Sequence, residues 1–203
     1  MLITMSSKKY ISLGGNCAIA YHIKKLTKQP TYPFDWCQIT LLQLKEVLEE
    51  DFRNFDKVRL VKFSEKHPPD TDLQSSDGSW ILKNSFQVKF AHQVLDRLQL
   101  PLFIERLQVR INRFKDLRSG NEELRFLRLE TSRWRPIFDK YLKKILEILS
   151  ERYEDFRMVL WVQKDSKVLV ENKFLEIRYF EEFSEDWRYM FLEEDLPNIV
   201  KRI

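Results

Sequence analysis

The sequence predicts an α/β fold in which a central, mainly parallel sheet is flanked by helices. A short apolar run at residues 9–13 leads directly into a helical pattern at residues 18–26. In the second half, an amphipathic pattern at residues 136–153 is followed by a continuous apolar run at residues 158–162. Strands and helices that alternate in this way are typical of layered domains, and a strand apolar throughout is typical of a sheet covered on both faces.

The amino-terminal half predicts one strand, two helices and a long loop. Residues 9–13 are the strand and residues 18–26 the first helix. Residues 40–52 form the second helix, because apolar residues recur there at helical spacing. Residues 64–79 are polar and rich in turn formers. They are the only candidate boundary within residues 1–203, which we expect to form a single domain.

The middle of the chain predicts a hairpin and a long helix. Residues 80–82 are apolar, a turn is expected at residues 84–85, and Phe86, Val88 and Phe90 then alternate with polar residues. This pattern indicates a hairpin or an edge strand. A helix is expected over residues 102–117, because a stop signal follows at residues 119–120.

The last part of the chain predicts strand, helix, strand and strand. Residues 124–129 form the first of these strands, and the helix at residues 136–153 has Pro136 in its first turn. Residues 158–162 are expected in the centre of the sheet, and the alternating residues 175–179 nearer an edge. Short connections between these elements favour parallel pairing.

Composition limits the classes of protein to which the chain can belong. Of 203 residues, 43% are hydrophobic and 13% aromatic, so the chain can bury a full core. No apolar run approaches the roughly 18 residues that cross a bilayer, and only two cysteines occur. We therefore expect an intracellular, cytoplasmic protein without a membrane partner. The sequence indicates no particular substrate, protein partner or oligomeric state.

Charge and motif spacing argue against several other functions. The net charge of +4 arises from 35 basic and 31 acidic residues that are interspersed, so a nucleic-acid partner is not expected. No metal site is expected, because two cysteines 19 residues apart with scattered histidines do not match zinc spacing. No cofactor is expected either, since the glycine pair lacks the remainder of a nucleotide-binding fingerprint.

The most informative local feature is the segment Gly14-Gly15-Asn16-Cys17 between the first strand and the first helix. Adjacent glycines allow a sharp turn, which would bring Cys17 to the first turn of the helix. The helix dipole and unpaired amides there favour a thiolate, the form in which cysteine is nucleophilic. The same segment is also compatible with a tight turn that only buries a small residue.

A nucleophilic thiol requires an imidazole as proton acceptor, and the chain has three histidines. His22 falls on a different face of the predicted helix from Cys17, and His67 lies in the polar loop. His92 follows an alternating strand and is the better candidate for the base. Asp35, between aromatic residues, could orient the imidazole as the third member of a triad. It could equally cap the following helix or pair with an arginine.

Two stretches of the sequence resemble a known family. Residues 12–20 (Ser-Leu-Gly-Gly-Asn-Cys-Ala-Ile-Ala), followed by residues 32–36 (Tyr-Pro-Phe-Asp-Trp), resemble the opening of the putative papain-like cysteine peptidases of bacteria and large DNA viruses. A weaker similarity covers residues 86–130. It includes Phe-Ala-His at residues 90–92 and the Arg113-Phe114 pair, which precedes the strand expected at residues 124–129. The resemblance implies that Cys17 is the nucleophile and His92 the base, whereas Asp35 matches the motif without an assigned role.

The chain also departs from papain-type enzymes. Ile11 occupies the position of their oxyanion-hole glutamine, Ala18 replaces the aromatic residue that often follows the cysteine, and Gln93 follows the histidine where the family has aspartate. An oxyanion hole would therefore need the Cys17 amide together with the Asn16 side chain or a loop amide, which makes residues 15, 16 and 18 (Gly15, Asn16 and Ala18) the candidates. The strand order also fits Rossmann-like layering better than papain's two lobes.

Two hypotheses follow from the sequence. In the first, the protein is a thiol-dependent hydrolase or acyl-transfer enzyme that acts on an amide or ester carbonyl, through either a dyad of Cys17 and His92 or a triad in which Asp35 also orients His92. In the second, it is a non-catalytic α/β module that binds a protein or a small anion at the helix after the glycine turn.

Overall fold

The computed structural model describes residues 8–62, 80–90, 99–130, 139–164, 166–180 and 197. Its elements, in chain order, are β1 (Lys8–Ser12), α1 (Cys17–Thr27), β2 (Cys37–Gln38), α2 (Leu41–Glu49), β3 (Val58–Lys62), β4 (Trp80–Asn84), β5 (Lys89–Phe90), α3 (Leu100–Asp116), the short 3₁₀ helix η2 (Leu117–Ser119), β6 (Glu123–Leu129), α4 (Asp139–Arg152), β7 (Phe156–Gln163) and β8 (Leu175–Phe180).

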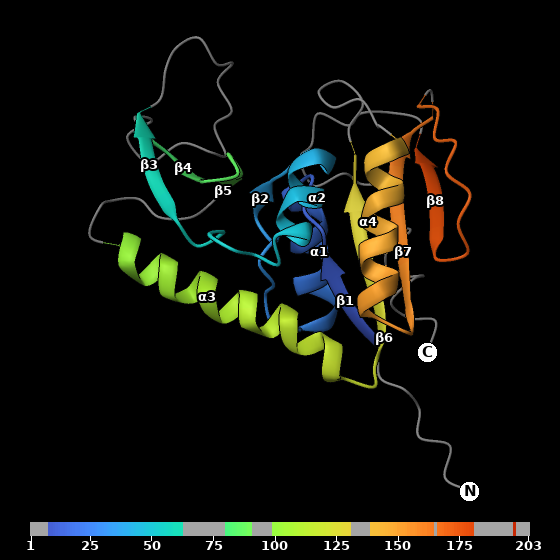
Figure 1. The fold of residues 1–203 in the computed structure, drawn as a ribbon, viewed down its shortest axis with the longest axis horizontal. Helices are drawn as coiled ribbons and strands as arrows, with labels where there is room; N and C mark the ends of the chain where they lie inside the picture. Colours follow the sequence, from blue (N-terminus) through green and yellow to red (C-terminus); the bar gives the residue numbers. More distant parts are fainter. Residues whose placement is uncertain are drawn as a thin grey trace, which may run out of the picture.

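The main sheet has four parallel strands in the order β1-β6-β7-β8 (Figure 1). Helix α1 packs on one face, where its apolar residues meet Leu127, Leu129, Val159 and Trp161. Helices α2, α3 and α4 contribute to the larger core on the other face. This arrangement confirms the predicted α/β fold with a parallel sheet flanked by helices, and it places β7 in the interior and β8 at an edge, as expected.

A second sheet, in the order β2-β5-β4-β3, is antiparallel and lies beside the main sheet (Figure 1). The hairpin of β4 and β5 confirms the pattern read at residues 80–90. Strands β2 and β3 were not predicted from the sequence. Strand β2 has only two residues, whereas β3 (Val-Arg-Leu-Val-Lys) begins with apolar and charged residues in alternation, a strand signal that was overlooked.

Local capping explains where the helices begin and end. Thr40 caps α2, and its side chain and that of Gln43 form a capping box. The predicted end of this helix at residue 52 is wrong, because α2 stops at Glu49. Asp51 and Phe52 then take left-handed backbone angles, with φ of 48° and 64°, that a helix cannot continue through.

A cluster of phenylalanines packs around Phe34 in the larger core. The ring of Phe34 lies 5.4 Å from that of Phe52, 5.7 Å from that of Phe55 and 5.6 Å from that of Phe114. These separations are typical of packed aromatic pairs. The unusual string at residues 32–36 therefore has a core residue at its centre, and this core residue fixes the position of the neighbouring Asp35.

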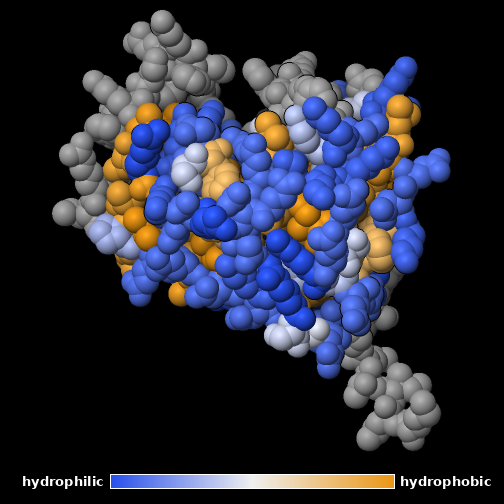
Figure 2. Space-filling model, in the orientation of Figure 1, coloured by the Kyte–Doolittle hydropathy of each residue, from blue (hydrophilic) through white to orange (hydrophobic). Residues whose placement is uncertain are grey.

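Most of the surface shown in Figure 2 is hydrophilic, with apolar patches over β3 and the amino-terminal half of α3. Leu102 and Val109 of α3 are 46% and 51% exposed. Across the described ranges, no helix is both long enough and apolar enough to traverse a bilayer.

Some of the predicted features lie outside the described residues. They are His67 and most of the polar loop at residues 64–79, the segment with Ala91, His92 and Gln93, and the first residues of the helix predicted at 136–153. The expectation of a single domain over residues 1–203 stays a prediction.

Candidate active site

The glycine turn begins where β1 reaches the carboxyl end of the sheet. Leu13 extends the pairing of β1 with β6, since its N–H donates to the carbonyl of Leu127 at 2.9 Å. Gly14 and Gly15 then adopt φ of 72° and 88°, which side chains rarely allow. The chain thereby reverses over the carboxyl edge of β6, the region in which open parallel sheets bind ligands.

Close packing, as well as backbone angle, requires both glycines. A Cβ atom on Gly14 would collide with the side chain of Ile39, and one on Gly15 with the carbonyl oxygen of Leu129. The turn is therefore held between the end of β6 and the connection from β2 to α2. Such a position fixes the entry of α1 relative to the sheet.

Cys17 is the first residue of α1, as the sequence predicts. Asn16 caps this helix, and its Oδ1 accepts the N–H of Ala18 at 2.8 Å. Cys17 is the amino-terminal residue of this 11-residue helix, and it is buried, with 9% of the residue exposed. The helix dipole favours negative charge at this position.

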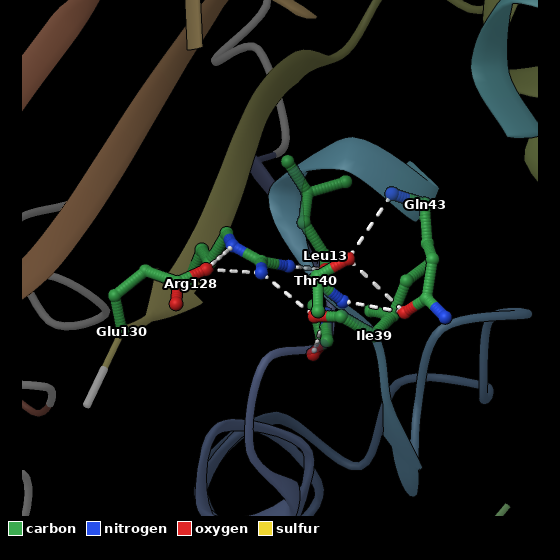
Figure 3. Close-up of polar contacts among 8 residues, drawn as sticks. Leu13, Ile39, Thr40, Gln43, Arg128 and Glu130 are labelled. Carbon is green, nitrogen blue, oxygen red and sulfur yellow. Dashed lines mark hydrogen bonds and ion pairs between the residues drawn. The ribbon is translucent and has the colours of Figure 1, made fainter. Parts of the chain in front are cut away.

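A buried ion pair between Arg128 and Glu130 holds the residue before the glycine turn in place. Arg128 on β6 is fully buried, and its guanidinium donates to the carbonyls of Leu13 at 2.6 Å and Ile39 at 2.8 Å (Figure 3). Its Nε also donates to Oε1 of Glu130 at 2.5 Å. Arg128 therefore links β6 to the residue before Gly14 and to the residue before the cap of α2.

Arg128 and Glu130 were not among the residues predicted for the site, although the sequence contains a signal for them. Leu124, Phe126 and Arg128 alternate along β6, so they share the face that enters the larger core. A charge at a core position needs a partner, and Glu130 is two residues further on the same face. An arginine in phase with buried apolar residues, followed by a carboxylate at the second position, is the pattern to look for.

Asp35 is buried in a turn of its own. Its Oδ2 accepts the N–H of Tyr32 at 2.9 Å, and only 7% of the residue is exposed. Burial raises the pKa of Asp35 to about 7, although the Tyr32 bond and the guanidiniums of Arg110 and Arg113 oppose the increase. Of the alternatives, capping of the following helix is wrong because Thr40 caps α2. The charges of Arg110 and Arg113 act on the carboxyl, but the ion pairs of the described residues do not include Asp35.

Strand pairing brings the end of β5 close to the glycine turn. Phe90 lies opposite Cys37 in the small sheet. The Sγ atom of Cys37 is 3.4 Å from the position that a Cβ on Gly14 would take, and this thiol donates to the carbonyl of Phe34 at 3.0 Å. His92, two residues after Phe90, is outside the described residues.

His22 is the only histidine among the described residues. His22 is buried on α1, with its ring 5.2 Å from that of Tyr21 in an edge-on arrangement. Within the described part of the chain, His, Cys, Asp and Glu do not gather in groups of three that could hold a metal ion.

The chain matches the model of a known protein family over most of its length. The family model described as "Putative papain-like cysteine peptidase (DUF1796)" matches residues 8–166. The chain belongs to this family. The matched region runs from β1 through β7 and includes the glycine turn, Cys17, Asp35 and the Arg128–Glu130 pair.

A curated relative comes from a large DNA virus. Uncharacterized protein R408 of Acanthamoeba polyphaga mimivirus is 29% identical over 136 residues, which cover 60% of this chain and 61% of the viral protein. The match thus spans less than two thirds of that relative. No solved structure matched the chain.

The buried carboxyl of Asp35 predicts a pH-dependent effect of Asp35→Asn. Because the folded pKa of about 7 exceeds the ordinary value of 3.8, the folded state retains a proton that the unfolded chain releases. Stability from this group is complete below the ordinary pKa and is lost as pH rises to about 7. Between pH 5 and 8 the free energy of unfolding of the parent should fall by about 2–3 kcal/mol more than that of Asp35→Asn.

Urea unfolding of both proteins at pH 5 and pH 8 measures this difference. Asp155→Asn is the matched control, because Asp155 is exposed and its substitution should leave the pH dependence of the parent unchanged. An Asp35→Asn protein with the parent's pH dependence would contradict the assignment of the raised pKa to Asp35.

Proposed function

We propose that this protein is a thiol-dependent hydrolase or acyl-transfer enzyme that acts on an amide or ester carbonyl, with Cys17 as the nucleophile. The observation that carries the proposal is the position of Cys17, which begins α1 directly after a glycine turn over the carboxyl edge of the parallel sheet. Membership of a family described as cysteine peptidases supports the same chemistry.

His92 is the proposed base. Phe90 pairs with Cys37, whose thiol lies beside Gly14, three residues before the nucleophile. A two-residue step along a chain spans at most about 7 Å. The position of His92 in the sequence is therefore compatible with a role next to the turn.

Asp35 is the proposed orienting residue for His92. It lies two residues before Cys37, in the segment that leads into the pairing with β5. With a pKa raised to about 7, its carboxyl is partly protonated near neutral pH. It would therefore act mainly by hydrogen bonding, and only partly by stabilising an imidazolium through its charge.

Gly15, Asn16 and Ala18 are the proposed residues around the oxyanion, together with the amide of Cys17. The Ala18 N–H donates to Asn16 in the cap. It would have to exchange this bond for one to the substrate oxygen. Replacement of Asn16 should therefore affect the helix cap and the reaction together.

The proposed reaction proceeds in two steps. The Cys17 thiolate attacks the carbonyl carbon, and collapse of the tetrahedral intermediate expels the leaving group, which takes the proton held by His92. Water, deprotonated by His92, then attacks the thioester and releases the acid and the thiol. In an acyl transfer, another nucleophile replaces water.

An activated ester tests this proposal. With p-nitrophenyl acetate we expect a burst of p-nitrophenol equal to the enzyme concentration, and an increase in intact mass by one acetyl group on Cys17. Cys17→Ala should abolish the burst, and His92→Ala should slow acylation and deacylation by roughly 10²-fold or more. Cys37→Ser is the matched control and should retain the burst.

The opposite outcome is equally specific. If acetyl groups are found on lysines, and the parent and Cys17→Ala show the same burst and the same increase in mass, the proposed enzymatic function is contradicted. Together with slow labelling of Cys17 that accelerates only on unfolding, that result would favour the non-catalytic binding module.

A further inference from the structure

Three arginines on α3 share one side of the helix. Arg106, Arg110 and Arg113 follow one another at spacings of four and three residues, which stack side chains on a helical face. Together with Thr31 and the exposed Val109, they line a surface groove of about 380 Å³. None of the residues that line the groove belongs to the glycine turn or to α1, and the groove reaches the segment just before Asp35.

Within the described ranges, two carboxyl groups, those of Asp35 and Glu105, lie near the three guanidiniums of this groove. Among the ion pairs of the described residues, none involves Arg106, Arg110 or Arg113. Burial lowers the pKa of Arg110, and the charges of Arg106 and Arg113 lower it further, while Asp35 opposes them. Glu105 is an exposed carboxylate at the rim.

One side of the groove is already fixed. Arg113 donates through Nη1 to the carbonyl of Thr31 at 2.5 Å, which joins α3 to the loop before Asp35. Arg110 is half-buried behind it, with Asp35 as its nearby carboxyl. An arginine held in this way loses little side-chain entropy when it binds an anion.

We propose that the groove lined by Arg106, Arg110 and Arg113 binds the phosphate group of a phosphomonoester. Guanidinium groups form paired hydrogen bonds with phosphate oxygens. Three cations opposed by Glu105 and a partly protonated Asp35 match a dianion better than a single carboxylate. Leu102 and Val109, both exposed at the groove, provide apolar surface for the ester substituent.

Calorimetry on the full chain at low chloride tests the proposal with three probes. Phenyl phosphate should bind more tightly than inorganic phosphate, because only the ester contacts the apolar rim. Acetate should bind at least tenfold more weakly than either. If inorganic phosphate binds as tightly as phenyl phosphate, the ester substituent does not contact the groove and that part of the proposal is overturned. If acetate binds as tightly as phenyl phosphate, the groove does not select phosphate and the proposed site is overturned.

Variants locate the site on α3. Arg106→Gln and Arg110→Gln should each weaken phenyl phosphate binding about tenfold or more, and Arg157→Gln, an exposed arginine at the start of β7, should not. Cys17→Ala should bind as the parent does, so this proposal and the proposed enzyme fail independently. Unchanged affinity in both α3 variants would overturn the assignment.

Asp35→Asn provides a second test, because it should increase the affinity for phenyl phosphate without removing an arginine. Among the described residues, the charged and titratable groups around Asp35 are Tyr32, Arg110 and Arg113, and the proposed function adds His92. At pH 8 its carboxylate competes with the ligand for the arginines, so Asp35→Asn should tighten phenyl phosphate binding about threefold or more. At pH 5.5 the difference should shrink, and equal or weaker binding by Asp35→Asn at pH 8 would contradict the site.

Discussion

Arg128→Met is expected to lower the free energy of unfolding by about 3–5 kcal/mol, the usual cost of removing one partner of a buried ion pair. The substitution leaves the carboxylate of Glu130 buried without its guanidinium. It also removes the donor from the carbonyls of Leu13 and Ile39. Chemical denaturation at neutral pH measures the loss.

Two further variants separate the buried pair from a general effect of losing an arginine. Arg125→Met on the same strand removes a guanidinium that pairs with Glu123 near the surface, so it should cost less than about 1 kcal/mol. Arg128→Met combined with Glu130→Leu should recover part of the stability, because no charge then stays buried. Equal losses for Arg125→Met and Arg128→Met would contradict the supporting role of Arg128.

Gly15→Ala is expected to cost about 2–5 kcal/mol, the sum of a strained backbone and a steric clash. The new Cβ would meet the carbonyl oxygen of Leu129, which belongs to the sheet and cannot move aside as a flexible side chain can. The turn must shift, and the first turn of α1 shifts with it. Alkylation of Cys17 in the folded protein should therefore slow as well.

Gly120→Ala is the matched control for this substitution. Gly120 has an ordinary φ of −85°, and a Cβ there would meet the carboxylate of Glu122, a flexible side chain that can rotate away. We expect a change within about 0.5 kcal/mol. A Gly15→Ala protein as stable as Gly120→Ala would show that the turn is not constrained by β6.

The sequence predicted the parallel sheet because its strands carry strong local patterns. Strand β7 is apolar almost throughout, and α4 has apolar residues at helical spacing. The small sheet was predicted only at its hairpin. Strand β2 exists because Cys37 and Gln38 pair with β5, a contact about 50 residues away in the chain that no local pattern indicates.

In the candidate site, too, some features follow from neighbouring residues and others depend on residues far away in the chain. The glycine turn and the placement of Cys17 at the start of α1 follow from neighbouring residues, so the sequence was sufficient. The environment of Asp35 depends on Arg110 and Arg113 of α3, some 75 residues later. Arg128 is intermediate, because its phase along β6 indicates burial but not which carbonyls it binds.

The central claim is that the start of α1 activates Cys17, and the pH dependence of its alkylation tests this most directly. In Cys37→Ser, which leaves a single thiol, the rate of reaction with iodoacetamide is measured from pH 5 to 10. We predict a midpoint well below about 8.5, the value for an ordinary cysteine, and slower labelling near neutral pH in His92→Ala. A midpoint at or above that value, with labelling accelerated only by unfolding, would contradict the account.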